Sequence, residues 1–251
     1  MATKNIRNAP SSTHIVANYD DDRDIMRNNL LKALSQDFYP QNYTLFLKLL
    51  DAVMNVQNID WAIAQAEVFA SQNFETEKQK QKAKTLRTIA IEALNSLRPY
   101  LSTDENRWLK PAGVIDFHTP VGVKIPIKFL GIYRYDGKTR LCLMNYWKTY
   151  LTNQQICTLI GLARYYVSQY PEYDGIDLEF VDISCLPKEK KRQLDVYGWN
   201  TFPSLAEDDL TDRMSRLAEA YLWAQENKTE RPKDMPRHSE DHDPNQYGFG
   251  F

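Results

Sequence analysis

The stretch from residue 121 to residue 149 constrains the fold more than any other part of the chain. Residues 121–135 are rich in β-branched and aromatic side chains, as strands are, and residues 140–147 form a second run of this kind. Between them stands the turn sequence Tyr-Asp-Gly-Lys, and an Asp-Gly pair readily adopts the positive φ of a tight hairpin. The sequence therefore predicts an antiparallel hairpin, with one long strand before the turn.

A helix and a further strand are expected after the hairpin. Apolar residues recur at helical spacing between residues 153 and 170, with Asn153 as the predicted N-cap. Residues 176–180 then alternate apolar and acidic side chains, which places Asp177 and Glu179 on the solvent side of a strand. A strand-helix-strand connection of this length favours a parallel pair of strands, so the expected sheet is mixed.

The N-terminal part of the chain has a helical period instead. Apolar stripes between residues 20 and 101 predict four helices, the third capped by Asp60 and the fourth ending before Pro99. A last helix is expected from Ser204, with Glu207 in the capping-box position. The expected organisation is a flexible arm, a helical segment, an α/β core and a disordered tail with an aromatic end, at residues 1–19, 20–110, 111–226 and 227–251.

Composition limits the classes of function open to the chain. The formal net charge of -2 over 251 residues excludes a strongly basic nucleic-acid binder but allows a local basic patch. The three cysteines contain no Cys-x-x-Cys pair, which is typical of free thiols in a reducing compartment. Because no apolar run approaches the roughly 18 residues of a membrane span and no signal peptide is evident, we expect a cytoplasmic protein without a membrane partner.

The end of the second hairpin strand carries a lysine in an informative context. The strand ends in Asn-Tyr-Trp-Lys-Thr, which places Lys148 at its end, and Gln154 and Gln155 open the following helix. Over roughly residues 110–225 this order resembles the PD-(D/E)XK superfamily of nucleases, in particular its RecB-like members. The resemblance implies a restriction-endonuclease-like α/β/α core with a mixed sheet, in an α/β (α+β) protein with an N-terminal helical segment. It also implies a catalytic-lysine position at Lys148 and a helix glutamine at Gln154 or Gln155.

The acidic residues of such a nuclease are missing where the resemblance places them. In that superfamily, two carboxylates on adjacent strands hold magnesium, which prefers hard oxygen ligands, and the metal activates a water molecule. The matching positions here are residues 130–132, which read Leu-Gly-Ile, and Tyr146. Because neither position supplies a suitable oxygen, Lys148 is interpreted as vestigial, and no metal or other cofactor is expected.

Four other carboxylates leave an active nuclease open as an alternative. They lie on expected strands of the core and are Asp116, Asp177, Glu179 and Asp182. If they converge on Lys148, they supply hard ligands for magnesium from new positions. This alternative therefore predicts that these carboxylates surround the lysine.

Two further segments are candidate contacts with partners. A compact basic run lies on a short helix expected at residues 187–195, and its candidate contacts with nucleic-acid phosphates are Lys188, Lys190, Lys191 and Arg192. The C-terminal tail ends in aromatic residues that suit a peptide docking into the groove of a protein partner, namely Tyr247, Phe249 and Phe251.

Three hypotheses of function follow from these patterns. The leading hypothesis is a catalytically degenerate nuclease-like protein that acts as a binding or scaffolding component in a nucleic-acid-processing complex. Its partner class comes from the resemblance, since a fold alone does not define a function. The second hypothesis is an active magnesium-dependent nuclease that uses the four displaced carboxylates. The third is a protein-interaction adaptor that uses its aromatic tail and has no role with nucleic acid.

Overall fold

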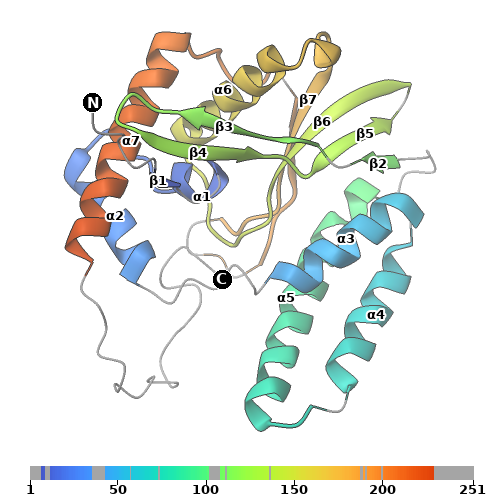
Figure 1. The fold of residues 1–251 in the computed structure, drawn as a ribbon. Coiled ribbons are helices and arrows are strands. Elements are labelled where there is room, and N and C mark those ends of the chain that lie inside the picture. The colour runs from blue at the N-terminus through green and yellow to red at the C-terminus, as the bar shows by residue number, and fades with distance from the viewer. Residues whose placement is uncertain are drawn as a thin grey trace.

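The computed structural model has a mixed α/β fold, as the sequence predicts (Figure 1). None of the described helices is long and apolar enough to cross a membrane. The structure describes residues 7–8, 12–35, 43–56, 58–72, 74–101, 108–110, 112–135, 137–186, 189, 191–198 and 200–228.

The larger of two sheets has five strands. In spatial order they are β2 (Trp108–Lys110), β5 (Gly131–Tyr135), β6 (Lys138–Asn145), β7 (Asp177–Asp182) and β8 (Asp195–Gly198). The expected hairpin is confirmed, because β5 and β6 pair in antiparallel register with Tyr135 opposite Lys138. β6 and β7 are parallel, and β8 is antiparallel to β7. The sheet is therefore mixed, as predicted.

The smaller sheet contains β1 (Arg7–Asn8), β4 (Val123–Lys128) and β3 (Val114–His118), in that spatial order. The sequence predicts one long strand over residues 121–135, and this prediction is wrong. Phe129 and Leu130 separate β4 from β5, and the two strands belong to different sheets. β4 pairs with β3 and β5 pairs with β6, and one straight strand cannot reach both partners. The apolar pattern runs through the break, so it gives no sign of the division.

The crossover between β6 and β7 is α6 (Asn153–Gln169), at the place where a helix is expected. Its N-cap is Thr152 and not Asn153, because Thr152 and Gln155 form a reciprocal capping box in which Gln155 Oε1 accepts from the Thr152 amide at 2.9 Å. Every residue from Gln155 to Ala163 is buried. A helix that is buried on all sides lies inside the protein, and its faces must be covered by other elements.

The N-terminal segment covers part of α6. Residues 12–19 are not the flexible arm that the sequence predicts: they include α1 (Ser12–Val16), which contacts α6 and β4. Ile15 and Val16 are 1% and 0% exposed. The segment is too short to show a periodicity of its own, so its burial depends on partners that are distant in the sequence.

The small sheet and the last helix cover other sides of α6. Phe117 of β3 and Tyr165 of α6 pack with their ring centroids 4.9 Å apart, and Tyr166 donates a hydrogen bond to the Gly113 carbonyl at 3.1 Å. α7 (Glu207–Asn227) also contacts α6. The aromatic side chains of α6 are therefore used in packing between the helix and the small sheet.

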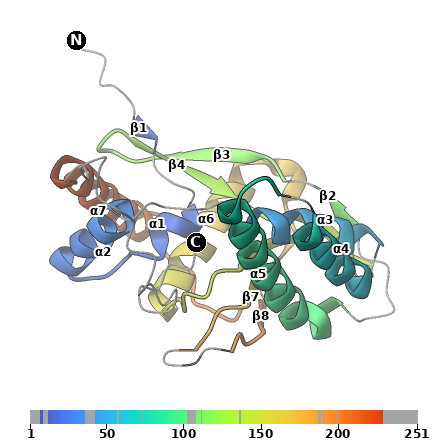
Figure 2. The same cartoon turned by 90° about the horizontal axis from the view of Figure 1, so that it is seen from below.

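The helices of the N-terminal half form two groups. α2 (Arg23–Ser35) packs along α7, away from α3, α4 and α5 (Figure 2). The α3–α5 group consists of α3 (Thr44–Val56), α4 (Ile59–Ser71) and α5 (Glu77–Leu101), which pack on one another. The single helical segment expected over residues 20–110 is therefore divided, and α2 belongs with the C-terminal helix.

Three helix ends differ from the expected ones. α4 is capped by Asn58, whose side chain accepts from the Trp61 amide, and Asp60 lies in its first turn. α5 continues through Pro99 to Leu101, since its last residues are buried against the rest of the protein. α7 begins at Glu207 with Ala206 at the N-cap, three residues later than predicted from Ser204. The start of α4 thus follows a local cap two residues earlier than expected, whereas the end of α5 follows the burial of its last residues.

Gly161 lies where α6 meets the start of α7. A Cβ at this position lies 3.1 Å from Leu210 Cδ1 and 3.4 Å from Leu205 Cδ1. We expect Gly161→Val to lower the free energy of unfolding by about 1–3 kcal/mol, because the added methyl groups overpack this contact. Gly198→Val is the control, since a Cβ there meets nothing within 4 Å, and we expect a change of no more than about 0.5 kcal/mol. Urea denaturation measures both, and equal losses would contradict the close packing of α6.

Candidate functional site

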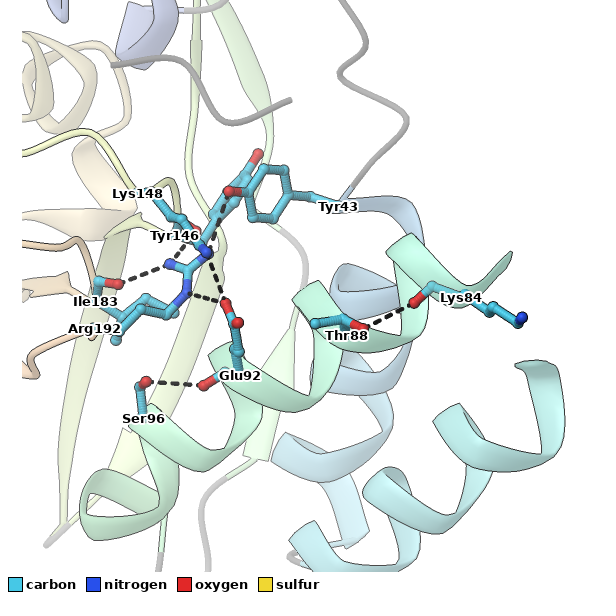
Figure 3. Close-up of polar contacts among 9 residues, drawn as sticks. All are labelled: Tyr43, Lys84, Thr88, Glu92, Ser96, Tyr146, Lys148, Ile183 and Arg192. Atoms are coloured by element: carbon cyan, nitrogen blue, oxygen red, sulfur yellow. Dashed lines mark hydrogen bonds and ion pairs between the residues drawn. The ribbon is translucent and has the colours of Figure 1, made fainter. Parts of the chain in front are cut away.

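Lys148 lies in the segment between β6 and α6 (Figure 3). Its side chain is 18% exposed, and its Nζ lies 3.0 Å from Glu92 Oε2 of α5. The contact has the distance of an ion pair but not the alignment of a hydrogen bond. Lys148 therefore connects the larger sheet to the α3–α5 group instead of extending into solvent.

Arg192 joins the same site from the segment after β7. Its side chain is 2% exposed, and its Nε lies 4.0 Å from Glu92 Oε2. Nη1 donates hydrogen bonds to the Tyr146 and Ile183 carbonyls, at 2.9 and 2.8 Å, and Nη2 donates to the Tyr43 hydroxyl at 3.2 Å. Glu92 thus attracts two cations. We name this group of side chains the charged cluster: Tyr43, Glu92, Lys148 and Arg192.

The helix expected at residues 187–195 is not formed at residues 191–195, the described end of this range. Arg192 pairs with Cys185 in an isolated β-bridge, and β8 begins at Asp195. Among the described members of the run, Lys191 is exposed, whereas Arg192 faces inward. Lys188 and Lys190 lie outside the described residues. The sequence does not show that Lys191 is exposed and Arg192 buried, because the burial of Arg192 depends on contacts with residues that are distant in the chain.

A cavity of about 510 Å³ lies beside the charged cluster. Its lining comes from α5 and from the segment after β7, and consists of Glu92, Asn95, Ser96, Pro99, Lys191, Arg192 and Leu194. Because Arg192 bonds to the carbonyls that follow β6 and β7, the cavity lies beyond the carboxyl ends of these parallel strands, where α/β sheets commonly bind ligands. Within the described cluster and lining, three cations face one carboxylate. This local excess of positive charge favours an anionic ligand.

The carboxylates of the nuclease alternative make their polar contacts in other places. Asp116 Oδ2 lies 3.6 Å from Lys124 Nζ in the smaller sheet, and Asp177 Oδ2 lies 4.0 Å from Lys138 Nζ at the start of β7. Over the described part of the chain, no three His, Cys, Asp or Glu side chains are grouped so that they could hold a metal ion. The carboxylate that does meet Lys148 is Glu92, which the sequence analysis missed.

Glu179 is buried, so the solvent-facing position predicted for it from strand alternation is wrong. Its Oε1 accepts from Arg140 Nη1 at 2.6 Å, and the Tyr100 and Tyr133 hydroxyls both contact its Oε2. Burial raises the pKa of both tyrosines, which keeps them neutral. Because Tyr100 belongs to α5, the Glu179 network fastens this helix to the larger sheet. β7 lies inside the sheet, and a period of two does not show whether both faces are covered.

Asp182 supports the backbone that carries Lys148. Its Oδ1 accepts hydrogen bonds from the Ser184 amide at 2.8 Å and from Asn145 Nδ2 at 3.1 Å. The same Asn145 amide group donates to the Thr149 carbonyl at 3.0 Å. Burial raises the pKa of Asp182 to about 6, although the hydrogen bonds oppose this shift. Asp182 is therefore a positioning residue that acts on the segment around Lys148 through Asn145.

The raised pKa of Asp182 predicts a pH dependence of stability. A carboxyl group whose pKa is higher in the folded state stabilises the fold while it is protonated, and the contribution is lost as the pH rises through about 6. Relative to Asp182→Asn, the wild-type free energy of unfolding should therefore fall between about pH 4 and pH 7, by at most about 3 kcal/mol. Urea denaturation across this range measures the difference. Parallel pH profiles of the two proteins would show that the Asp182 pKa is not raised.

The two glutamines at the start of α6 hold the N-terminal segment. Gln155 Nε2 donates to the Ala17 and Tyr19 carbonyls, both at 3.0 Å, and Gln155 is 7% exposed. Gln154 Nε2 donates to the Asp21 carboxylate. Both side chains are therefore engaged in fastening residues 17–21 to α6, in the positions where the resemblance places a helix glutamine of the site.

Removing the Gln155 side chain should loosen this attachment. We expect Gln155→Ala to lower the free energy of unfolding by about 2–3 kcal/mol, because it removes half of the capping box and leaves two carbonyls without their donor. Limited proteolysis should also become faster near residues 17–21. Gln169→Ala, at the exposed end of α6, is the matched control. If both variants unfold at the same urea concentration, Gln155 does not hold the segment in the way described.

Tyr247, Phe249 and Phe251, the candidate partner-binding residues of the tail, lie outside the described residues. Comparison of the chain with protein-family models and with curated proteins found no match. The charged cluster and its cavity define what the site can do chemically. Their cations can attract and orient an anion, and the four carboxylates of the nuclease alternative are engaged in ion pairs or hydrogen bonds.

Proposed function

We propose that the protein is a non-hydrolytic binding component that holds nucleic acid through the charged cluster and the cavity beside it. The observation that carries this proposal is the excess of cations over carboxylates within the charged cluster and the cavity lining, next to a cavity of about 510 Å³. The formal net charge of the chain is -2, so this positive field is local. A local positive field beside a cavity suits a phosphate-bearing ligand.

Binding without hydrolysis is supported by the way in which the charges are paired. A magnesium-dependent nuclease needs carboxylates that are open to a hard cation beside the lysine. Here Lys148 is paired with Glu92, and Glu179 and Asp182 accept hydrogen bonds from protein groups. These contacts stabilise the attachment of α5 and the segment around Lys148. In this proposal, the α/β core resembles that of restriction nucleases and serves as a scaffold that holds the ligand.

Lys191→Glu tests whether nucleic acid binds at the cavity. Lys191 is exposed and lines the cavity, so its replacement should leave the fold intact. We expect the affinity for a labelled 20-nucleotide single strand to fall by about 3–10-fold, with a shallower dependence on salt, because a cation that meets phosphate is replaced by an anion. Fluorescence anisotropy at low and moderate salt measures both quantities.

Lys138→Glu is the matched control, since Lys138 is exposed at the opposite end of β6. Equal losses in the two variants would contradict a site at the charged cluster. Binding by neither wild type nor variants at low salt would reject nucleic acid as the ligand and favour the adaptor hypothesis. Magnesium-dependent shortening of the strand that is lost in Lys148→Met would reject the non-hydrolytic role and favour the nuclease hypothesis.

A further inference from the structure

Arg192 is a buried cation with one nitrogen, Nε, that forms no hydrogen bond. Its side chain is 2% exposed and lines the cavity, and its Nε makes no hydrogen bond. The other two nitrogens of the guanidinium donate to protein oxygens, which holds the group in one orientation (Figure 3). A buried donor without a hydrogen-bonded partner is costly unless a ligand or water satisfies it. The Nε group therefore marks a position at which an anion can bind.

Glu92 does not fill this position. It lies 3.0 Å from Lys148 Nζ but 4.0 Å from Arg192 Nε, which is beyond hydrogen-bonding distance. The Glu92 carboxylate is therefore paired mainly with Lys148. A buried guanidinium without a hydrogen-bonded counterion retains its attraction for a second anion, and a guanidinium binds phosphate oxygens especially well.

The rest of the lining suits a phosphate attached to an organic group. Lys191 supplies a second cation, and the exposed Asn95 supplies amide donors, whereas Pro99 and Leu194 form an apolar wall. The Ser96 hydroxyl donates a hydrogen bond to the Glu92 carbonyl at 2.9 Å, so toward a ligand it can act only as a hydrogen-bond acceptor. A volume of about 510 Å³ lies within the usual range of about 300–1,000 Å³ for sites that enclose a small ligand.

We propose that this cavity recognises a terminal phosphate group, as carried by the phosphorylated end of a nucleic acid or by a mononucleotide. The proposal deepens the proposed function, because it names the part of the nucleic acid that enters the site. A phosphate monoester carries a charge of about -1.5 to -2 near pH 7 and has three free oxygens. An internal phosphate of the backbone has one charge and two ester-linked sugars, so two cations attract it less strongly than a terminal phosphate.

The test compares single-stranded 12-mers of one sequence that carry a 5′-phosphate, a 3′-phosphate or no terminal phosphate. Fluorescence anisotropy with an internal label measures binding to the full chain. We expect one phosphorylated strand to bind at least about 5-fold more tightly than the strand without a terminal phosphate, by analogy with other charge-assisted hydrogen bonds. A nucleoside monophosphate should compete with this strand, and the nucleoside without phosphate should not.

Two variants that change the charge of the lining should act in opposite directions. Asn95→Asp adds an anion to the cavity and should remove the preference for the phosphorylated strand. Glu92→Gln removes the anion and should increase this preference by about 3–10-fold, which a purely structural role of Glu92 does not predict. The matched controls are Gln169→Glu at the exposed end of α6 and Glu67→Gln on α4, which should leave the preference unchanged.

The outcomes separate this proposal from the proposed function. Equal binding of all three strands would overturn the terminal-phosphate site, while binding to nucleic acid would stand. Binding of the nucleoside monophosphate without binding of any strand would support the cavity and reject the nucleic-acid function. A preference for the phosphorylated strand that survives in Asn95→Asp would place the site elsewhere and overturn the proposal for this cavity.

Discussion

The structure depends on a crossover helix that is buried on all sides over the stretch from Gln155 to Ala163. Because α6 connects β6 to β7, these strands are parallel, and their carboxyl ends lie at one edge of the larger sheet. The segments that follow the two strands therefore meet, and they bring Lys148 and Arg192 to the same carboxylate of α5. α1, α7 and the smaller sheet cover the remaining sides of α6. The site is thus a consequence of how the central helix is enclosed.

The helices of the α3–α5 group are attached to the larger sheet by polar contacts at two places. Near one end of the parallel strands, Tyr100 and Tyr133 contact Glu179, which also accepts from Arg140. At the carboxyl ends, the charged cluster makes the attachment. Buried charges are favourable only when their partners and hydrogen bonds are in place, so both contacts define one position of α5 on the sheet. Because α5 lines the cavity, the same contacts fix the position of the cavity wall relative to the sheet.

Local chemistry was sufficient to predict the elements whose cause is local. The Asp-Gly turn, the helical period after it and the alternation near residue 177 correctly indicated the hairpin, α6 and β7. The division of the long strand at Phe129 could not be read from the pattern, because it depends on which strand each half pairs with. The burial of Glu179 could not be predicted either, because an alternating pattern does not show whether both faces of β7 are covered. Glu92 flanks the apolar stripe of a long helix, where a glutamate ordinarily faces solvent, and its partner comes from a distant strand end.

The pairing of Lys148 with Glu92 decides what kind of ligand the cavity can accept. An anion about 5 Å from Glu92 is repelled by about 3 kcal/mol per unit charge at an effective dielectric constant of about 20, and each cation at the same distance attracts it by as much. Glu92 alone would cancel the attraction of Arg192. The ion pair with Lys148 offsets the carboxylate, since the two charges lie 3.0 Å apart and act together as a nearly neutral pair. Arg192 and Lys191 then determine the field in the cavity. Lys148 therefore has an electrostatic role beside the cavity: it neutralises the carboxylate that would otherwise repel an anion.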